Sequence, residues 1–380
     1  SDELNLLYRD NSGSFWLGSQ RGISFFDPSS KGFLGVGPSG NETSGIPTPI
    51  VWSFAESSKG NYMYVGTSKA VSRYDKLKGE FKQFYRESKS GKNSDETTIL
   101  SIEPISDQLI LLACVDGLFE LNIREDGYDF KRVKYESPQM DSKHDRAYCI
   151  LKLKEQKYLI ATKGGALIYD RKTKKIEAFE HDPKRPNETI SKGICRLAYR
   201  DRKGRIWLST STGGINQLEE KGDGYVISPY VYNRELSKLT QDYITTMYDD
   251  QNGVLWFGTL GSGLIRWDEK QKKGSAYSKI HGLPNDVIYG ILADKSGDLW
   301  LSTNKGLCVF NTKTGGTINY TEINGLMSNE FNLGAFFKSS TGTLYFGGIY
   351  GYNYFNPDDL EQVEQDIQIV FTKFKLENEW

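Results

Sequence analysis

Short apolar runs separated by polar turns fill the chain, and this pattern returns eight times at a spacing of 44 to 49 residues. The clearest copy runs from Asp201 to Thr210, where a polar turn leads into isoleucine, tryptophan, leucine and two small residues. Every copy has the same core order: a large apolar residue, a second apolar residue and two small ones. The eight large residues are Trp16, Tyr64, Leu111, Leu159, Trp207, Trp256, Trp300 and Tyr345.

Two further features of the copies predict neighbouring strands. An apolar run precedes the large residue in copies two to eight and predicts an inner strand. A glycine–apolar pair such as Gly263-Leu264 follows in every copy except the second, which has Ala70-Val71, and it predicts a third strand. No segment shows an apolar period of 3.6 residues over the length that a helix needs. The predicted inner strands are 51–55, 100–104, 149–153, 194–199, 244–248, 288–293 and 333–337.

A fixed repeat of this length, built from short strands and tight turns, is typical of a β-propeller. We therefore predict an all-β fold with four-stranded antiparallel blades. The last copy supplies three strands through Asn356 and then meets Pro357, so residues 33–36 are predicted to add the outer strand that closes this blade. Closure of that kind favours seven blades, and eight blades remain an alternative. Residues 1–32 would then be the last blade of a preceding propeller, and 33–360 the propeller itself.

An aspartate opens the turn before the large residue in four copies. Because aspartate accepts bonds from backbone N–H groups and glycine supplies positive φ, the pair predicts a hairpin turn. A calcium loop is the alternative, but the other ligands that such a loop needs are missing. The pairs, each three residues apart, are Asp10 with Gly13, Asp201 with Gly204, Asp250 with Gly253 and Asp294 with Gly297.

Composition narrows the class of partner. The 380 residues include 48 basic and 49 acidic side chains, a formal net charge of −1, and no basic stripe that would predict a nucleic-acid partner. No apolar stretch is long enough to span a bilayer, and no signal peptide is recognisable.

Four cysteines are too scattered for a disulfide framework or a zinc site. Cys149 and Cys195 occupy matching positions in neighbouring copies, and we expect both to pack as small buried apolar residues.

Catalytic motifs are missing from the sequence. His144, His181 and His281 lie at unrelated repeat positions, and neither a metal-binding His spacing nor a nucleophile turn occurs. The glycines occur in turns, and none forms a phosphate-binding loop ahead of a helix. We therefore predict no catalytic residue, metal site or cofactor. A propeller lyase or glycosidase, with carboxylates converging on the channel from distant blades, is the remaining enzymatic alternative.

Binding is the better prediction, because the loops that lead from each outer strand to the next inner strand gather at one mouth of a propeller's channel. These loops mix aromatic rings with planar polar groups, which suit the apolar faces and the hydroxyls of sugars. The plainer alternative is that many of these side chains are simply buried between blades. The candidate ligand-binding residues are Trp52, Arg146, Tyr148, Arg196, Tyr243, Tyr289, Asn329 and Glu330.

Residues 282–292 and 294–307 together resemble the two-component regulator propeller repeat. Residues 324–332 and 354–358 are similar to the last repeat of such sensors, and 367–376 to the first strand of the immunoglobulin-like domain that follows them. The resemblance covers nearly the whole chain and is weakest in copies three and four, where Leu111 and Leu159 replace tryptophan. It implies that 361–380 begin an immunoglobulin-like domain.

The resemblance also implies a function: a periplasmic sensor region of a membrane-bound histidine kinase, often the hybrid kind found in Bacteroides-like bacteria. In that family the signal is usually an oligosaccharide, an adjacent propeller and the immunoglobulin-like domain belong to the same chain, and the receptor is a homodimer. The membrane is reached only through a transmembrane helix of the parent protein. The alternative is a scaffold propeller that binds no ligand and serves as a dimerisation surface. The repeat motif is structural and carries no ligand residues over to this chain.

Overall fold

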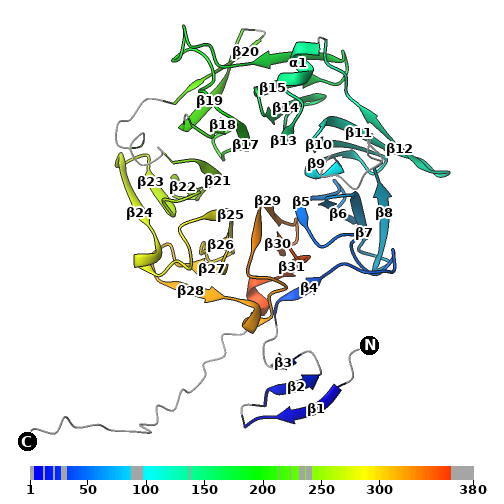
Figure 1. Cartoon of the computed structure of the whole chain (residues 1–380). Coiled ribbons are helices and arrows are strands. Elements are labelled where there is room, and N and C mark those ends of the chain that lie inside the picture. Colours follow the sequence, from blue (N-terminus) through cyan, green and yellow to red (C-terminus); the bar gives the residue numbers. More distant parts are fainter. Residues whose placement is uncertain are drawn as a thin grey trace, which may run out of the picture.

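The computed structural model describes residues 4–11, 13–19, 22–26, 32–86, 97–136, 138–212, 214–222, 224–230, 236 and 242–360. Within them, seven four-stranded antiparallel sheets stand around a central axis as the blades of a propeller (Figure 1). The predicted all-β, seven-bladed fold is confirmed, and copies two to eight of the repeat form the blades. The alternative with eight blades is excluded.

In every blade the first strand lines the channel and the fourth lies at the periphery (Figure 1). The first three blades contain β5 (Val51–Glu56), β6 (Tyr62–Thr67), β7 (Ala70–Asp75) and β8 (Glu80–Tyr85); β9 (Ile99–Ser106), β10 (Leu109–Cys114), β11 (Gly117–Ile123) and β12 (Tyr128–Arg132); and β13 (Ala147–Lys154), β14 (Lys157–Thr162), β15 (Gly165–Asp170) and β16 (Lys175–Phe179).

The next three blades follow the same plan, and the seventh takes its outer strand from the N-terminal side of the chain. They contain β17 (Cys195–Arg200), β18 (Ile206–Thr210), β19 (Gly214–Lys221) and β20 (Gly224–Pro229); β21 (Ile244–Asp249), β22 (Val254–Thr259), β23 (Leu264–Asp268) and β24 (Lys273–Tyr277); β25 (Ile288–Ala293), β26 (Leu299–Thr303), β27 (Gly306–Phe310) and β28 (Thr317–Tyr320); and β29 (Phe331–Lys338), β30 (Leu344–Gly348), β31 (Tyr352–Phe355) and β4 (Leu34–Val36).

Strand β4 closes the ring, as predicted for residues 33–36. It pairs with β31 so that Leu34 lies opposite Tyr354 and Val36 opposite Tyr352. Just before it, the ring of Phe33 packs edge-on against Phe355, with ring centroids 4.7 Å apart. Strand pairing and aromatic packing therefore join the two ends of the propeller.

Apolar side chains from neighbouring blades meet in shared clusters, which explains the repeated large residue. Trp256 of β22 is almost fully buried and packs with Leu301 and Phe310 of the next blade. The small residue after it is needed for this approach: a Cβ on Gly258 would lie 2.9 Å from a methyl carbon of Ile288, on the next blade's inner strand. The core is therefore a ring of interfaces between blades.

The glycine of the glycine–apolar pair has a steric reason. Gly263 immediately precedes the third strand of its blade and has φ of +74°, a conformation that residues with a side chain rarely adopt. A Cβ at this position would lie 2.0 Å from the carbonyl oxygen of Tyr277, which ends the outer strand β24. The pair thus marks the place where the third and fourth strands begin to separate.

Three further strands, β1 (Leu4–Arg9), β2 (Phe15–Ser19) and β3 (Gly22–Phe26), form a separate sheet outside the ring (Figure 1). They come from the first copy of the repeat, and Leu6, Leu7 and Ile23 are exposed on them. Their assignment to a preceding propeller remains a prediction. The predicted immunoglobulin-like segment, residues 361–380, lies outside the described residues.

Helical segments are few and short in the described part of the chain. The six-residue helix α1 (Pro138–Lys143) connects β12 to β13 and is too short to give a periodic signal. Three 3₁₀ turns, η2 (Lys279–His281), η3 (Glu322–Asn324) and η4 (Pro357–Asp359), also lie outside the strands. No helix among these residues is long and apolar enough to cross a membrane.

Candidate binding site in the central channel

The inner strands enclose a cavity of about 680 Å³ in the central channel. Its walls come from the first halves of β5, β9 and β13, from most of β17 and β21, and from parts of β25 and β29. Because each inner strand follows a loop from the previous blade, these strand beginnings share one mouth of the channel. The polar and aromatic side chains that line it include Trp52, Ser53, Ser101, Arg146, Tyr148, Arg196, Thr245, Thr246 and Phe336.

A local irregularity recurs near the start of the inner strands. In β5, β13, β17, β21 and β25 the pairing register shifts between the first residue and the third, so the second residue has no direct partner. A shift of this kind also leaves Leu100 unpaired in β9. Such bulges re-aim a side chain and are common beside functional sites. The six unpaired residues are Trp52, Leu100, Tyr148, Arg196, Thr245 and Tyr289, and all except Tyr289 line the cavity.

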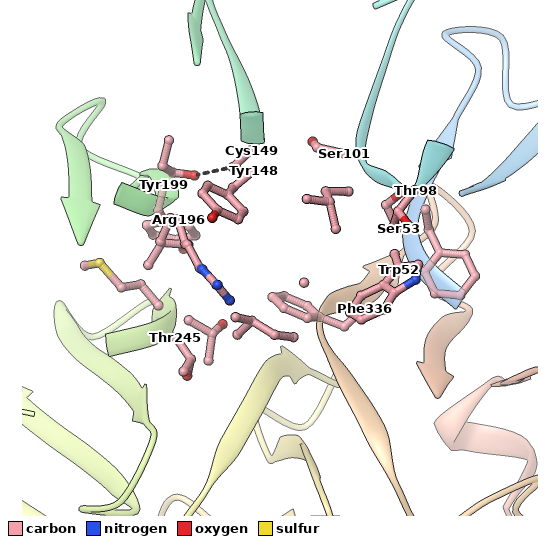
Figure 2. A pocket seen from close by; sticks show the side chains of 18 of the residues that line it. Trp52, Ser53, Thr98, Ser101, Tyr148, Cys149, Arg196, Tyr199, Thr245 and Phe336 are labelled. Atoms are coloured by element: carbon pink, nitrogen blue, oxygen red, sulfur yellow. Dashed lines mark hydrogen bonds between the residues drawn. The ribbon is translucent and has the colours of Figure 1, made fainter. Parts of the chain in front are cut away.

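One side of the cavity is cationic. The guanidinium carbon of Arg196 lies 4.6 Å from the centre of the Tyr148 ring on the neighbouring blade, and Figure 2 shows this arginine extending into the cavity. Arg146, immediately before β13, is the second guanidinium in the lining. Throughout the described ranges, neither guanidinium makes an ion pair or a hydrogen bond. Stacking on an aromatic face orients an arginine without neutralising it.

The opposite side of the cavity is aromatic. Figure 2 shows Trp52 and Phe336 across from Arg196 and Tyr148. The indole nitrogen Nε1 of Trp52 donates a hydrogen bond of 3.1 Å to Oγ of Ser68, which fixes the plane of the ring. Figure 2 shows the hydroxyl residues Ser53 and Thr98 beside Trp52, so aromatic surface and hydrogen-bonding groups are mixed along the wall, as is common in small-molecule sites.

Four of the eight predicted residues, Trp52, Arg146, Tyr148 and Arg196, therefore line one cavity. The other four do not line it. Tyr243 lies just before β21, and burial raises the pKa of its phenol. Tyr289 is half-buried and packs against the cluster between the last two blades, and burial also raises its pKa.

The last two predicted residues belong to the connection between β28 and β29. Oδ1 of Asn329 accepts a hydrogen bond of 2.9 Å from the backbone N–H of Glu322, and the side chain of Glu322 accepts one in return from the Asn329 backbone. Glu330 is exposed. Asn329 thus shapes its own loop, and neither residue reaches the cavity.

Sequence reasoning missed Ser53, Ser101, Thr245 and Phe336. Thr245 could have been found from the repeat itself, because it stands eleven residues before Trp256, as Arg196 stands before Trp207 and Tyr148 before Leu159. Aligning the copies on their large residues would have placed these positions in one column. Ser53, Ser101 and Phe336 have no such signal, since they face the channel through local strand geometry.

The cysteines largely behave as small apolar residues. All four are free, and Cys195 is fully buried, as expected from its position. Cys149 departs from the expectation of a buried packing role, because it is only half-buried and lines the cavity. Its thiol lies among apolar neighbours, and burial raises its pKa to about 11. It is therefore a neutral part of the wall at physiological pH.

Few charged side chains line the cavity. Its charged side chains are the two arginines, and it includes no aspartate, glutamate or histidine within the described residues. Nor do the ranges that the structure describes contain a group of three or more His, Cys, Asp or Glu residues that could hold a metal. The guanidinium groups and the hydroxyl groups of the lining can donate hydrogen bonds to a bound molecule.

Residues 238–261 and 282–305 match the family described as the two-component regulator propeller. The histidine kinase P4 of Formosa agariphila is 26% identical over 224 residues, which cover 57% of this chain and 16% of that protein.

Two solved structures from B. thetaiotaomicron share the fold. The extracellular domain of the hybrid two-component system BT3049 is 22% identical with a TM-score of 0.70, covering 94% of this chain and 45% of that one. The extracellular domain of BT4673 is 17% identical with a TM-score of 0.62, covering 86% and 40%. The chain thus spans less than half the length of these relatives. Two of its repeats are thus similar to the two-component regulator propeller family, and its seven blades share the fold of these extracellular domains.

Proposed function

We propose that this chain is the extracytoplasmic ligand-sensing propeller of a membrane-bound two-component sensor histidine kinase, and that its channel cavity binds an oligosaccharide. The observation that carries the proposal is the row of bulge residues, which brings Trp52, Tyr148 and Arg196 to one cavity. The likeness to extracellular domains of two-component systems supports a periplasmic location.

The chemistry of the wall suits a sugar. Aromatic rings can stack on the apolar faces of a pyranose, while guanidinium and hydroxyl groups bond its hydroxyls. A cavity of about 680 Å³ falls within the range usual for small-ligand sites. The contacts of Trp52 with Ser68 and of Arg196 with the Tyr148 ring hold both groups before a ligand arrives, which lowers the entropy cost of binding.

Signalling requires that the ligand favour one arrangement of domains over another, because equal affinity for both would shift nothing. Seven blades packed through continuous apolar clusters resist internal rearrangement. We therefore infer that binding changes how the propeller sits against its neighbouring propeller, the immunoglobulin-like domain or a second receptor chain, as a rigid-body movement.

Calorimetry on the 380-residue chain with a broad set of oligosaccharides tests the binding step. We expect at least one to bind without turnover. Trp52→Ala should weaken that binding by about tenfold, because loss of an aromatic anchor typically costs more than about 1 kcal/mol. Trp16→Ala, which alters a tryptophan outside the ring, is the matched control and should bind normally. Absence of binding by every oligosaccharide, with a normal melting curve, would refute the proposal.

A scaffold role is the second candidate, favoured by exposed apolar residues on the same face of the ring as the cavity mouth. Ile280 on η2 is 89% exposed and Ile323 on η3 is 74% exposed, and both turns connect an outer strand to the next inner strand. Such side chains can form a contact with a neighbouring domain or a second chain. Sedimentation analysis of Ile280→Glu with Ile323→Glu would detect a loss of self-association that ligand binding alone does not predict.

A further inference from the structure

We infer that the ligand of the channel cavity carries a negative charge, as a carboxylate or sulfate group on the oligosaccharide. This inference rests on the proposed function and deepens it. Its basis is the charge of the lining: Arg146 and Arg196 are the charged side chains that face the cavity among the described residues. A neutral sugar needs hydrogen-bond donors, but it does not need two positive charges in one cavity.

Two acidic residues near the mouth lie beside other cations. Asp145, adjacent to Arg146 in the chain, has its Oδ1 3.7 Å from Nζ of Lys163. Asp116, next to the lining residue Val115, has its Oδ1 2.6 Å from Nη2 of Arg86. These two carboxylates are thus paired elsewhere, and in the described structure the two lining arginines have no counter-ion.

The position of Arg196 makes the lack of a counter-ion significant. The residue is half-buried, and its guanidinium carbon lies 4.6 Å from the Tyr148 ring centre, so part of its hydration shell is already lost. A partly desolvated charge is unfavourable unless it is paired. An oxyanion entering the cavity would restore that pairing with two charge-assisted hydrogen bonds, which the planar guanidinium makes well to both carboxylate and sulfate.

Stacking also favours a fixed anion position. Tyr148 and Arg196 occupy equivalent bulge positions on adjacent inner strands, so their contact is set by the repeat geometry. The guanidinium is held in the cavity before binding (Figure 2). The apolar walls formed by Trp52 and Phe336 would then receive the face of the sugar ring.

The test uses calorimetry on the 380-residue chain with matched pairs of oligosaccharides. One arm compares uronate oligosaccharides with their uncharged methyl esters, and the other compares sulfated galactan oligosaccharides with their desulfated forms. In at least one arm the charged member should bind about tenfold or more tightly than its neutral partner, because charge-assisted bonds are roughly twice as strong as neutral ones. The responding arm identifies the anion.

Two variants locate the anion. Arg196→Gln should remove the preference for the charged member, and Arg146→Gln, on an exposed side chain, should reduce it without disturbing the fold. Lys192→Gln is the matched control, because it removes one positive charge from an exposed loop residue that does not line the cavity. Melting curves of all three variants confirm folding.

The outcomes are distinct. Equal or tighter binding of the neutral members, or equal effects of Arg196→Gln and Lys192→Gln, overturns the inference and leaves the proposed oligosaccharide function standing. Binding of no oligosaccharide overturns both. Preferential binding of charged members, lost in Arg196→Gln and kept in Lys192→Gln, supports both.

Discussion

The indole nitrogen Nε1 of Trp207 donates a hydrogen bond of 2.9 Å to Oδ2 of Asp201, six residues earlier in the chain. The other carboxylate oxygen of Asp201 accepts the backbone N–H of Arg205, 2.9 Å away, and closes the hairpin turn. Asp294 makes the same pair of contacts with Trp300 and Asp298. The repeated aspartate therefore shapes the turn and also orients the tryptophan that packs between blades.

Replacement of Asp201 by alanine should lower the free energy of unfolding by roughly 2–4 kcal/mol, because it leaves a fully buried indole N–H without a partner and Arg205 without one of its carboxylates. Asp250→Ala is the matched comparison, since the corresponding indole contact with Trp256 is 3.5 Å and no arginine joins it in the described structure. Urea unfolding measures both. A loss in Asp250→Ala as large as that in Asp201→Ala would contradict this explanation of the turn.

Two glycines with similar backbone angles should respond differently to alanine. Gly204 has φ of +80° and no atom within 4 Å of the place that a Cβ would occupy, so its substitution should cost only about 1 kcal/mol of backbone strain. Gly263 has φ of +74°, and its Cβ would lie 2.0 Å from the Tyr277 carbonyl oxygen. Denaturant titration should show that Gly263→Ala lowers the free energy of unfolding at least twice as much as Gly204→Ala does. Equal losses would mean that the outer strand can move away freely.

Because β4 closes the ring, the stability of an N-terminally shortened chain should depend on whether this strand is kept. A chain that begins at residue 32 lacks β1 to β3 but keeps Phe33 and β4, and it should melt at nearly the same temperature as the full chain. A chain that begins at residue 38 also loses the pairing with β31 and the Phe33–Phe355 contact. The free energy of unfolding of this shorter chain should fall by roughly 3–5 kcal/mol, the cost typical of removing a large buried side chain. Similar melting of both shortened chains would show that the ring holds without this strand.

Glu103 on β9 gives the propeller a pH-dependent stability. Burial raises the pKa of its carboxyl group from 4.5 to about 6, and Lys152 only partly opposes this. Between these two values the folded chain binds the proton more tightly than the unfolded chain does, so the free energy of unfolding falls as pH rises and then levels off. The shift corresponds to at most about 2 kcal/mol.

Glu103→Gln removes this titration. Compared with the unaltered chain, the variant should show no such fall between pH 4.5 and 6, and it should be the more stable of the two at pH 7. Urea unfolding at several pH values gives the difference. If the free energies of unfolding of the two proteins change with pH in parallel, Glu103 is not the group that causes the fall.

The repeat predicted much of the fold because each element in it answers a local steric or packing demand. Gly263 is required by a close carbonyl, Trp256 fills the space between blades, and residues 33–36 complete a blade that has only three strands of its own. Helix α1 was missed because six residues carry no period.

The candidate site was harder to predict than the fold. Trp52, Tyr148 and Arg196 were found through their place at the start of inner strands, but Tyr289 holds the equivalent position and lies outside the cavity lining. Which bulge residues reach the cavity depends on the packing around each strand, which the repeat does not encode. Phe336 reaches the cavity from the far part of β29, through a register irregularity that no sequence pattern marks.

A crystal structure of the chain with a bound acidic oligosaccharide would show whether the channel is the sensing site. We expect the sugar inside the channel cavity, with its carboxylate or sulfate on Arg196 and a ring face against Trp52. An oligosaccharide bound elsewhere on the propeller, with none in the channel, would contradict both the site and its preference for an anion.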